Sequence, residues 1–143
     1  MKTLFLAFCA LVITSGVSAQ SKKAADAVQF KEVKYDFGKI KQNVAVTHDF
    51  AFKNVSSKPV VVESATASCG CTTPKWPNAP VVKSKSDKIT AGFNAASVGP
   101  FEKTITVKLA GYDQPVELKI VGEVLTPEAY VNYKSGKDKK TGK

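Results

Sequence analysis

Hydrophobic and polar residues alternate with a period of two along most of this chain. The alternation covers four segments, residues 44–53, 89–95, 101–109 and 116–124. In the first segment the hydrophobic positions are Val44, Val46, Phe50 and Phe52. Successive side chains of a β-strand point to opposite faces of a sheet, so this period is typical of half-buried antiparallel strands. The pattern therefore predicts a strand over each segment.

Shorter segments rich in β-branched and aromatic residues add three strands, over residues 28–33, 35–37 and 60–67. Turn-forming residues separate the strands at Asn54–Pro59, Ser97–Pro100 and Gly111–Pro115. No segment has a convincing helical period. About seven short strands with regular turns predict an all-β fold, an immunoglobulin-like antiparallel β-sandwich. A closed barrel is the structural alternative.

The first 19 residues have the composition of a secretory signal peptide. Lys2 gives a positive start, Leu4 to Ile13 form an apolar run, and Val17-Ser18-Ala19 supplies a small-residue cleavage site. The apolar run is too short to span a bilayer as a helix, which needs about 20 residues. We therefore expect residues 1–19 to be removed, and the mature chain to be periplasmic or extracellular with no transmembrane helix.

The rest of the chain divides into three expected parts. They are a flexible N-terminal segment over residues 20–27, an immunoglobulin-like domain over 28–126 and a Lys-rich flexible tail over 127–143. The formal net charge is +9, and loss of Lys2 lowers it to +8. The chain contains no arginine. Lysine alone lacks the planar fork that makes bidentate phosphate and base contacts, so we expect no specific nucleic-acid binding.

The strongest chemical motif is Cys69-Gly70-Cys71. Cys9 leaves with the signal peptide, so these are the two cysteines of the mature chain, in an oxidising compartment. A disulfide between them would close a three-residue loop, whose entropic contribution to stability is only about 1.6 kcal/mol. Gly70 lets the backbone bend to bring the sulfurs together. Such a bond is a weak staple, and strained, exposed disulfides are the labile ones.

Three roles for Cys69 and Cys71 stay open: a structural local disulfide, redox exchange or Cu(I) binding, and pairing with another chain. Two thiolates suit Cu(I), although the mature chain has no methionine to add as a ligand. Two cysteines and one histidine are too few for a complete zinc site of Cys and His, which needs four ligands. No cofactor is expected. A nucleophilic cysteine needs a base, and the single histidine, His48, shares strand parity with Val46 and Phe50, which favours packing. The sequence therefore predicts no catalytic residue and no enzyme.

Trp76 lies between Pro74 and Pro77 and is the candidate interaction residue. An exposed indole can bind a partner, but one near a sandwich end more often covers the edge of the core, which is the favoured interpretation. Tyr130 and Tyr133 raise the same question in the tail, where an unstructured segment is the simpler account.

Five motifs in order carry a resemblance to a known family. They are Tyr35–Ile40, His48–Asn54, Ser68–Thr72, Gly99–Val107 and Leu118–Val124. Over roughly residues 28–125 the chain resembles the bacterial domain-of-unknown-function family 1573. The resemblance implies an exported immunoglobulin-like sandwich of Bacteroidetes type, related to ASH and major-sperm-protein-like domains, with no established activity. The chain departs from the family at Val82–Asp87, where a Pro-Gly-Glu-like turn is usual.

Two classes of function follow. The leading prediction is an exported, non-enzymatic module that binds a protein or cell-envelope partner through sheet edges and end loops, since open edges accept added strands. The alternative is a periplasmic thiol-redox or Cu(I)-binding protein that acts through Cys69 and Cys71.

Overall fold

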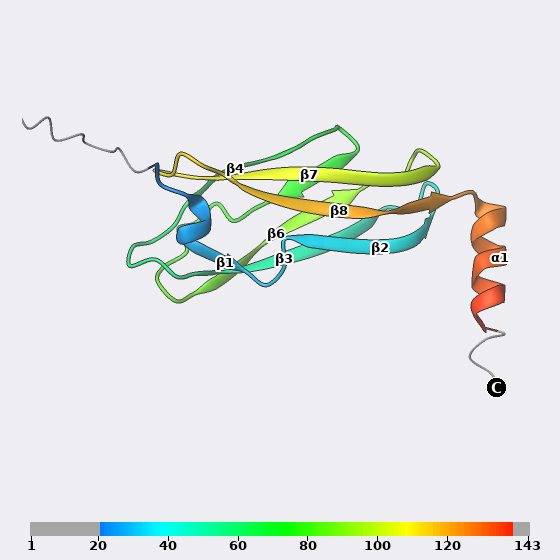
Figure 1. Ribbon diagram of the computed structural model, residues 1–143, viewed down its shortest axis with the longest axis horizontal. Helices are drawn as coiled ribbons and strands as arrows, with labels where there is room; N and C mark the ends of the chain where they lie inside the picture. Colours follow the sequence, from blue (N-terminus) through cyan, green and yellow to red (C-terminus); the bar gives the residue numbers. More distant parts are fainter. Residues whose placement is uncertain (1–20, 139–143) are drawn as a thin grey trace, which may run out of the picture.

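The computed structural model describes residues 21–138 of the chain. The expected signal peptide (1–19), with Cys9, and the end of the expected tail (139–143) lie outside the described residues. Two four-stranded sheets, in the orders β1-β3-β6-β5 and β2-β8-β7-β4, make up the fold. Figure 1 shows them extended along one long axis, with β1 and α1 toward opposite ends. The predicted β-sandwich is confirmed.

Residues 21–138 form eight strands, a short 3-10 helix before them and one α-helix after them. In chain order they are η1 (Ala24–Asp26), β1 (Val28–Phe30), β2 (Lys34–Lys41), β3 (Val46–Asn54), β4 (Val62–Ala67), β5 (Thr72–Lys75), β6 (Ser86–Phe93), β7 (Gly99–Leu109), β8 (Val116–Leu125) and α1 (Pro127–Asp138). The strand that sequence analysis missed is β5. Its four residues show no alternation of hydrophobic side chains, and it is a strand because it pairs with β6.

Each lateral edge of the sandwich consists of two consecutive strands that belong to different sheets. On one side these are β1 and β2, and on the other β4 and β5. The chain crosses from β1 to β2 without reversing direction, so β2 runs parallel to β8. The other strand pairs of the described chain are antiparallel. The purely antiparallel prediction is therefore wrong at β2.

Inward-facing side chains of the two sheets form one hydrophobic core. Its fully buried members include Phe50, Ile89, Ile105, Leu118 and Ile120. All of these lie on the hydrophobic faces that the period-two pattern predicts. Val44 is an exception to the pattern, because it precedes β3 and its side chain is 49% exposed.

The segment before β1 is packed, so the predicted flexible segment over residues 20–27 is wrong from Ala24 onward. Ala24 and Ala27 are 0% and 1% exposed. The Ala24 N–H donates to the Gln114 carbonyl at 2.9 Å. Small apolar side chains at these two positions fill space at the end of the core, and this packing orders the segment.

Residues 127–138 form α1, so the predicted flexible tail is wrong over this range. Thr126 caps the helix, because its Oγ1 accepts the Ala129 N–H at 3.3 Å. Pro127 has the fixed φ that suits the first helical position. The Tyr133 ring lies 5.3 Å from Lys39 Nζ of β2. Helix capping and this contact outweigh the Lys-rich composition on which the sequence prediction rested.

A buried asparagine organises the end of β3. Asn54 is 0% exposed, and its Nδ2 donates to the carbonyls of Lys58 and Val81 at 2.8 Å each. Its Oδ1 accepts the Ser56 N–H at 2.9 Å. A buried amide must satisfy its hydrogen bonds, so Asn54 fixes both the turn that follows β3 and the segment that leads into β6.

The connection at Val82–Asp87, which departs from the family pattern, is a tight turn. Ser84 has φ +65°, and the Lys85 N–H donates to the Val82 carbonyl at 3.1 Å. The left-handed region favours glycine. Ser84 therefore has the backbone conformation that a glycine would adopt in the usual Pro-Gly-Glu-like turn.

β2 contains a bulge that approaches β8 closely. The register shifts between Asp36 and Lys39, and the Gly38 N–H donates to Asp36 Oδ1 at 2.7 Å with φ +64° at Gly38. A Cβ on Gly122 would lie 2.8 Å from the Gly38 carbonyl oxygen and 2.9 Å from the Phe101 ring. The Tyr35–Ile40 motif therefore specifies a bulge that needs glycine on the facing strand.

We expect Gly122→Ala to destabilise the protein by about 1–3 kcal/mol, because the added methyl group would overlap backbone and ring atoms. Urea unfolding followed by circular dichroism measures the change. Gly136→Ala in α1 is the matched control, because its Cβ would meet open space, and it should leave stability equal or raise it by up to about 1 kcal/mol. Equal stability of Gly122→Ala and the wild type would contradict the close approach.

Candidate functional site: the Cys69–Cys71 crossover and the β1 groove

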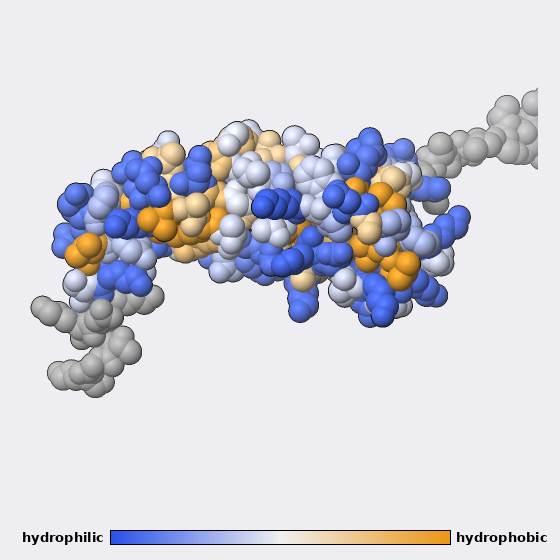
Figure 2. Space-filling model, turned by 180° about the vertical axis from the view of Figure 1, so that it is seen from behind, coloured by the Kyte–Doolittle hydropathy of each residue, from blue (hydrophilic) through white to orange (hydrophobic). Residues whose placement is uncertain are grey.

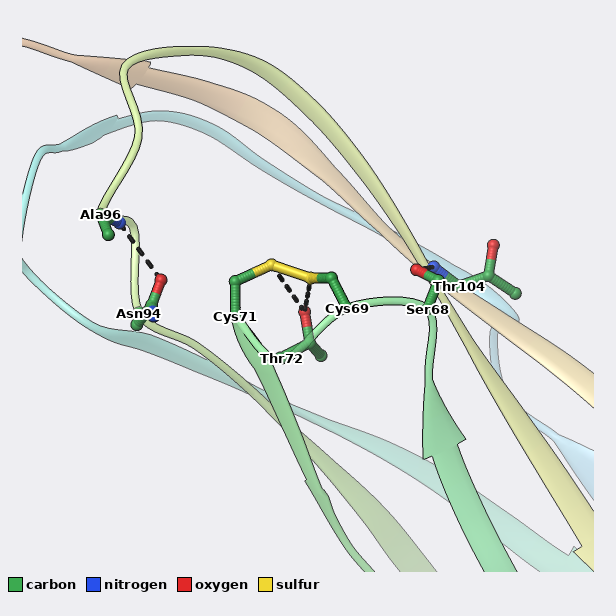
Figure 3. The surroundings of a disulfide bond; sticks show 7 residues. All are labelled: Ser68, Cys69, Cys71, Thr72, Asn94, Ala96 and Thr104. Atoms are coloured by element: carbon green, nitrogen blue, oxygen red, sulfur yellow. Dashed lines mark hydrogen bonds between the residues drawn. A yellow bond between two sulfur atoms is a disulfide. The ribbon is translucent and has the colours of Figure 1, made fainter.

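The structure joins Cys69 and Cys71 in a disulfide where the chain crosses from β4 to β5. Their Cα atoms lie 5.3 Å apart. Figure 3 shows the bond bridging the turn that carries Gly70. Both cysteines are half-buried, and Cys71 packs against the hydrophobic core. The sequence left three roles for the pair open, and the structure has the local disulfide. Redox exchange by the pair stays a prediction.

Hydrogen bonds hold the crossover on both sides of the disulfide. On the β7 side, the Ser68 N–H donates to the Thr104 carbonyl at 2.9 Å, and the Thr104 N–H donates to Ser68 Oγ at 3.1 Å. On the β6 side, the Asn94 N–H donates to the Cys71 carbonyl at 3.1 Å. The crossover is therefore anchored to both sheets by hydrogen bonds that do not involve sulfur.

Thr72 is the polar neighbour of both sulfurs. Its side chain is buried, with 4% exposure, and its Oγ1 lies 3.8 Å from Cys69 Sγ and 4.0 Å from Cys71 Sγ. Figure 3 shows the hydroxyl beneath the S–S bond. Thr72 belongs to the Ser68–Thr72 motif, but the sequence alone predicted no role for it. The signal was available, because a threonine that directly follows the cysteines can reach their sulfur atoms.

Trp76 lies beyond the other end of β5, so the structure does not bring it to the disulfide. Its ring is half-buried and packs against the core. This packing agrees with the favoured interpretation, and a role for Trp76 in binding a partner stays a prediction.

His48 is a packed histidine on the other lateral side of the sandwich. Its ring stacks on Tyr35 with centroids 3.5 Å apart and meets Phe50 edge-on at 4.8 Å. Its Nε2 lies 3.0 Å from Glu32 Oε1. The predicted packing of His48 is confirmed, and the structure does not place this imidazole beside the cysteines.

Within residues 21–138 no group of three or more His, Cys, Asp or Glu side chains is arranged to hold a metal ion. Cu(I) binding by Cys69 and Cys71 would require reduction of the disulfide first, because the thiolate is the metal ligand. It stays a prediction.

The surface carries several half-exposed valines. Val33, Val55, Val82 and Val98 are 51%, 48%, 49% and 50% exposed. Figure 2 shows two hydrophobic areas on one face of the molecule, one toward the α1 end and one toward the opposite end, with a paler and more polar region between them. Contiguous exposed apolar surface is typical of interaction sites.

An apolar groove lies beside β1. It has a volume of about 550 Å³, and η1, β1 and the start of β8 contribute to its walls. The apolar side chains of β1 and β8 in its lining are Val28, Phe30 and Val116, and the half-exposed Val33 and Val55 complete it. We refer to it as the β1 groove. The sequence alone did not predict this groove, although Val33 ends a predicted strand and Val55 is a hydrophobic residue in the predicted Asn54–Pro59 turn.

β1 leaves one side of its backbone unpaired. The Val55 N–H donates to the Ala27 carbonyl at 2.9 Å, and the Lys31 N–H donates to the Ala51 carbonyl at 3.0 Å. Backbone groups of alternate residues in an antiparallel strand face the same partner, so those of Val28 and Phe30 point away from β3. No described strand pairs with this outer side. The open edge therefore borders the β1 groove.

On the outer face of the first sheet, Asp49 of β3 is held by two residues of β6. Its Oδ2 accepts a bond from Lys88 Nζ at 2.6 Å, and its Oδ1 accepts one from Thr90 Oγ1 at 2.5 Å. The bond from Lys88, followed by that from Thr90, holds the pKa of Asp49 below its ordinary value of 3.8. The hydrogen bond between Lys88 and Asp49 also raises the pKa of Lys88. This exposed ion pair is a surface feature that stabilises little.

Residues 28–124 match the sequence profile of a family described as "Protein of unknown function (DUF1573)". The match covers well over half of the 143 residues. This chain belongs to the DUF1573 family. The bulge in β2, the disulfide crossover and most of the β1 groove all lie within the matched region of this DUF1573 chain. A comparison with curated proteins gives no match.

Solved structures share the fold of the DUF1573 chain. The ASH/PapD-like domain 7 of human CEP192 aligns with a TM-score of 0.62 and 8% identity, covering 81% of this chain and 97% of that one. A protein of unknown function from Porphyromonas gingivalis W83 aligns with a TM-score of 0.58 and 13% identity, covering 78% and 51%. The VesB protease of Vibrio cholerae aligns with a TM-score of 0.54 and 11% identity, covering 71% and 33%.

The DUF1573 chain thus spans about half of the Porphyromonas protein and a third of the protease. Identities this low show the fold alone, and the predicted immunoglobulin-like sandwich is confirmed. Among residues 21–138, no helix has both the length and the apolar character needed to cross a bilayer. The family is described as one of unknown function, and the comparisons identify no partner.

We expect Lys88→Met to raise the pKa of Asp49 toward 3.8, because it removes the bond that contributes most to the lowered value. A carboxyl NMR titration measures this pKa, and Lys53→Met, on β3 with Asp49, is the control. Since the folded pKa is lowered, ionised Asp49 stabilises the fold above about pH 4, and this contribution is lost as the pH falls through the folded pKa. An unchanged Asp49 titration in Lys88→Met would contradict the pairing.

Proposed function

We propose that this DUF1573 chain is an exported, non-enzymatic module that binds a protein by accepting an extended segment of it as an extra strand along β1. The observation that carries the proposal is the unpaired backbone of Val28 and Phe30 beside the β1 groove. In strand addition, main-chain hydrogen bonds supply affinity and pockets for alternate side chains supply specificity. This site offers both.

Two other edges are protected against strand addition. β2 carries the Gly38 bulge and ends at lysines, Lys34 and Lys41. β5 contains Pro74, which has no N–H to donate. Bulges, lysines and prolines are the usual means by which an edge strand avoids pairing. The contrast favours β1 over β2 and β5 as the binding edge.

The surrounding charge favours an acidic partner segment. A second, smaller pocket shares Gln29 and Phe30 with the β1 groove and is bordered by Lys31 and Lys53. The nearby Glu32 carboxylate lies against His48. We therefore propose an extended peptide with apolar side chains at alternate positions and acidic residues beside them.

The proposal includes export and the absence of catalysis. The signal-peptide composition of residues 1–19 supports export. His48, the single histidine, contacts three aromatic rings and the Glu32 carboxylate and lies away from the two cysteines. This arrangement favours a binding role.

We expect a double variant, Val33→Asp with Val55→Asp, to weaken peptide binding at least tenfold. Each change removes half-exposed apolar surface and places a carboxylate in the groove, where it repels the acidic peptide. The probe is a peptide selected from a phage library of acidic hexapeptides with alternating apolar residues. Isothermal calorimetry measures its affinity, and hydrogen exchange by NMR should show slower exchange of the Val28 and Phe30 amides when it is bound.

Val82→Asp is the matched control, because Val82 is exposed to about the same extent as Val33 and lies outside the groove. It should leave affinity unchanged. Binding that survives the double variant, or that leaves exchange at Val28 and Phe30 unaltered, would place the interaction elsewhere and overturn the proposal.

Export has its own test. We expect the protein recovered from envelope fractions of an expressing bacterium to begin at Gln20, because Val17-Ser18-Ala19 forms the cleavage site. Intact-mass spectrometry identifies this N-terminus, and Ala19→Tyr should block processing and retain the longer chain. An unprocessed wild-type chain in the cytoplasm would contradict export.

A further inference from the structure

We propose that the Cys69–Cys71 disulfide is a thiol–disulfide exchange site that a dithiol reduces reversibly, with the Thr72 hydroxyl as the hydrogen-bond donor to the sulfur that leaves. This activity is independent of the β1 groove, which lies on the other lateral side of the sandwich. It does not rest on the proposed binding function.

The position of the two cysteines favours attack at Cys69. Cys71 packs against the hydrophobic core, whereas Cys69 is not part of that packing. Both are half-buried, at a crossover on the protein surface. An attacking thiolate must approach a sulfur from solvent along the S–S axis. Cys69 Sγ is therefore the sulfur to be attacked, and Cys71 Sγ is the leaving group.

Thr72 supplies a hydrogen-bond donor for the half-buried Cys71 sulfur when it leaves. A thiolate released beside the core loses solvation, which raises its pKa and slows its departure. Thr72 is itself buried, and its hydroxyl reaches both sulfurs. When the bond breaks, the hydroxyl can donate to the Cys71 thiolate without a change of rotamer.

The crossover is built to keep its shape when the disulfide opens. Its links to β7 at Ser68 and to β6 through the Cys71 carbonyl involve no sulfur. The Thr72 N–H also donates to the Cys69 carbonyl at 3.2 Å and closes the turn. The two thiols therefore stay close after reduction, which favours intramolecular re-formation of the bond.

The exchange proceeds in two steps. A thiolate of the dithiol attacks Cys69 Sγ and forms a mixed disulfide; the Cys69–Cys71 bond breaks, and its electron pair passes to Cys71 Sγ, which takes a proton from water. The second thiol of the dithiol, after losing its proton to water, attacks the first sulfur of the same molecule and releases Cys69 as a thiolate that is then protonated. The protein disulfide gains two electrons, and the dithiol becomes a disulfide. The reverse sequence re-forms the Cys69–Cys71 bond.

The test uses the mature chain from Gln20 to Lys143, equilibrated with a series of reduced and oxidised dithiothreitol mixtures, quenched with acid and alkylated. We expect mass spectrometry to show the disulfide and dithiol forms exchanging across the series while far-UV circular dichroism stays unchanged. In Cys71→Ser, oxidised glutathione should form a single adduct at Cys69. A disulfide that resists reduction in the folded chain, or that opens only with unfolding, would make it a structural lock and overturn the proposal.

The role of Thr72 is tested by the rate of reduction. Thr72→Val should slow reduction roughly two- to tenfold, as expected for the loss of one hydrogen bond, and Thr72→Ser, which keeps the hydroxyl, should restore the rate. Thr73→Val, on the exposed face of the same strand, is the matched control and should not change it. Equal rates for Thr72→Val and Thr73→Val would remove Thr72 from the site.

Discussion

The structure depends on how the chain satisfies backbone hydrogen bonds at the two lateral edges of the sandwich. Each edge is one continuous stretch that pairs first with one sheet and then with the other: β1 with β3 and β2 with β8 on one side, β4 with β7 and β5 with β6 on the other. Buried backbone groups need partners, so a strand that changes sheets must give up one set of bonds before it gains the next. The two places where this happens are the two candidate sites.

At the first change of sheet, β1 ends at Phe30 and β2 begins at Lys34. β2 first pairs at Lys119 of β8, so the start of β8 borders the opening between the sheets. The β1 groove lies at this opening. At the second change of sheet, the crossover is closed by the disulfide and by hydrogen bonds to both sheets. One lateral side is thus left open and apolar, whereas the crossover on the other carries a local disulfide. This difference separates the proposed binding edge from the proposed exchange site.

Several family motifs acquire a physical meaning in the fold. Asp36 and Gly38 make the bulge that lets β2 follow β8, and Gly122 is required because the bulge comes within contact distance. Asn54 fixes the turn after β3. These residues stabilise the scaffold and do not contact the proposed peptide. The motif residues that belong to the proposed exchange site are Cys69, Cys71 and Thr72.

The sequence by itself determined the sandwich, because period-two burial is a local property: strand positions such as Phe50, Ile105 and Leu118 follow from the residues beside them. It also contained the capping signal at Thr126-Pro127, which composition obscured. Only the tertiary structure decided that β2 runs parallel to β8, that Thr72–Lys75 is a strand, and that Val28, Val33, Val55 and Val116 line one groove. These features depend on contacts between residues far apart in the chain, and local alternation carries no information about which strands become neighbours.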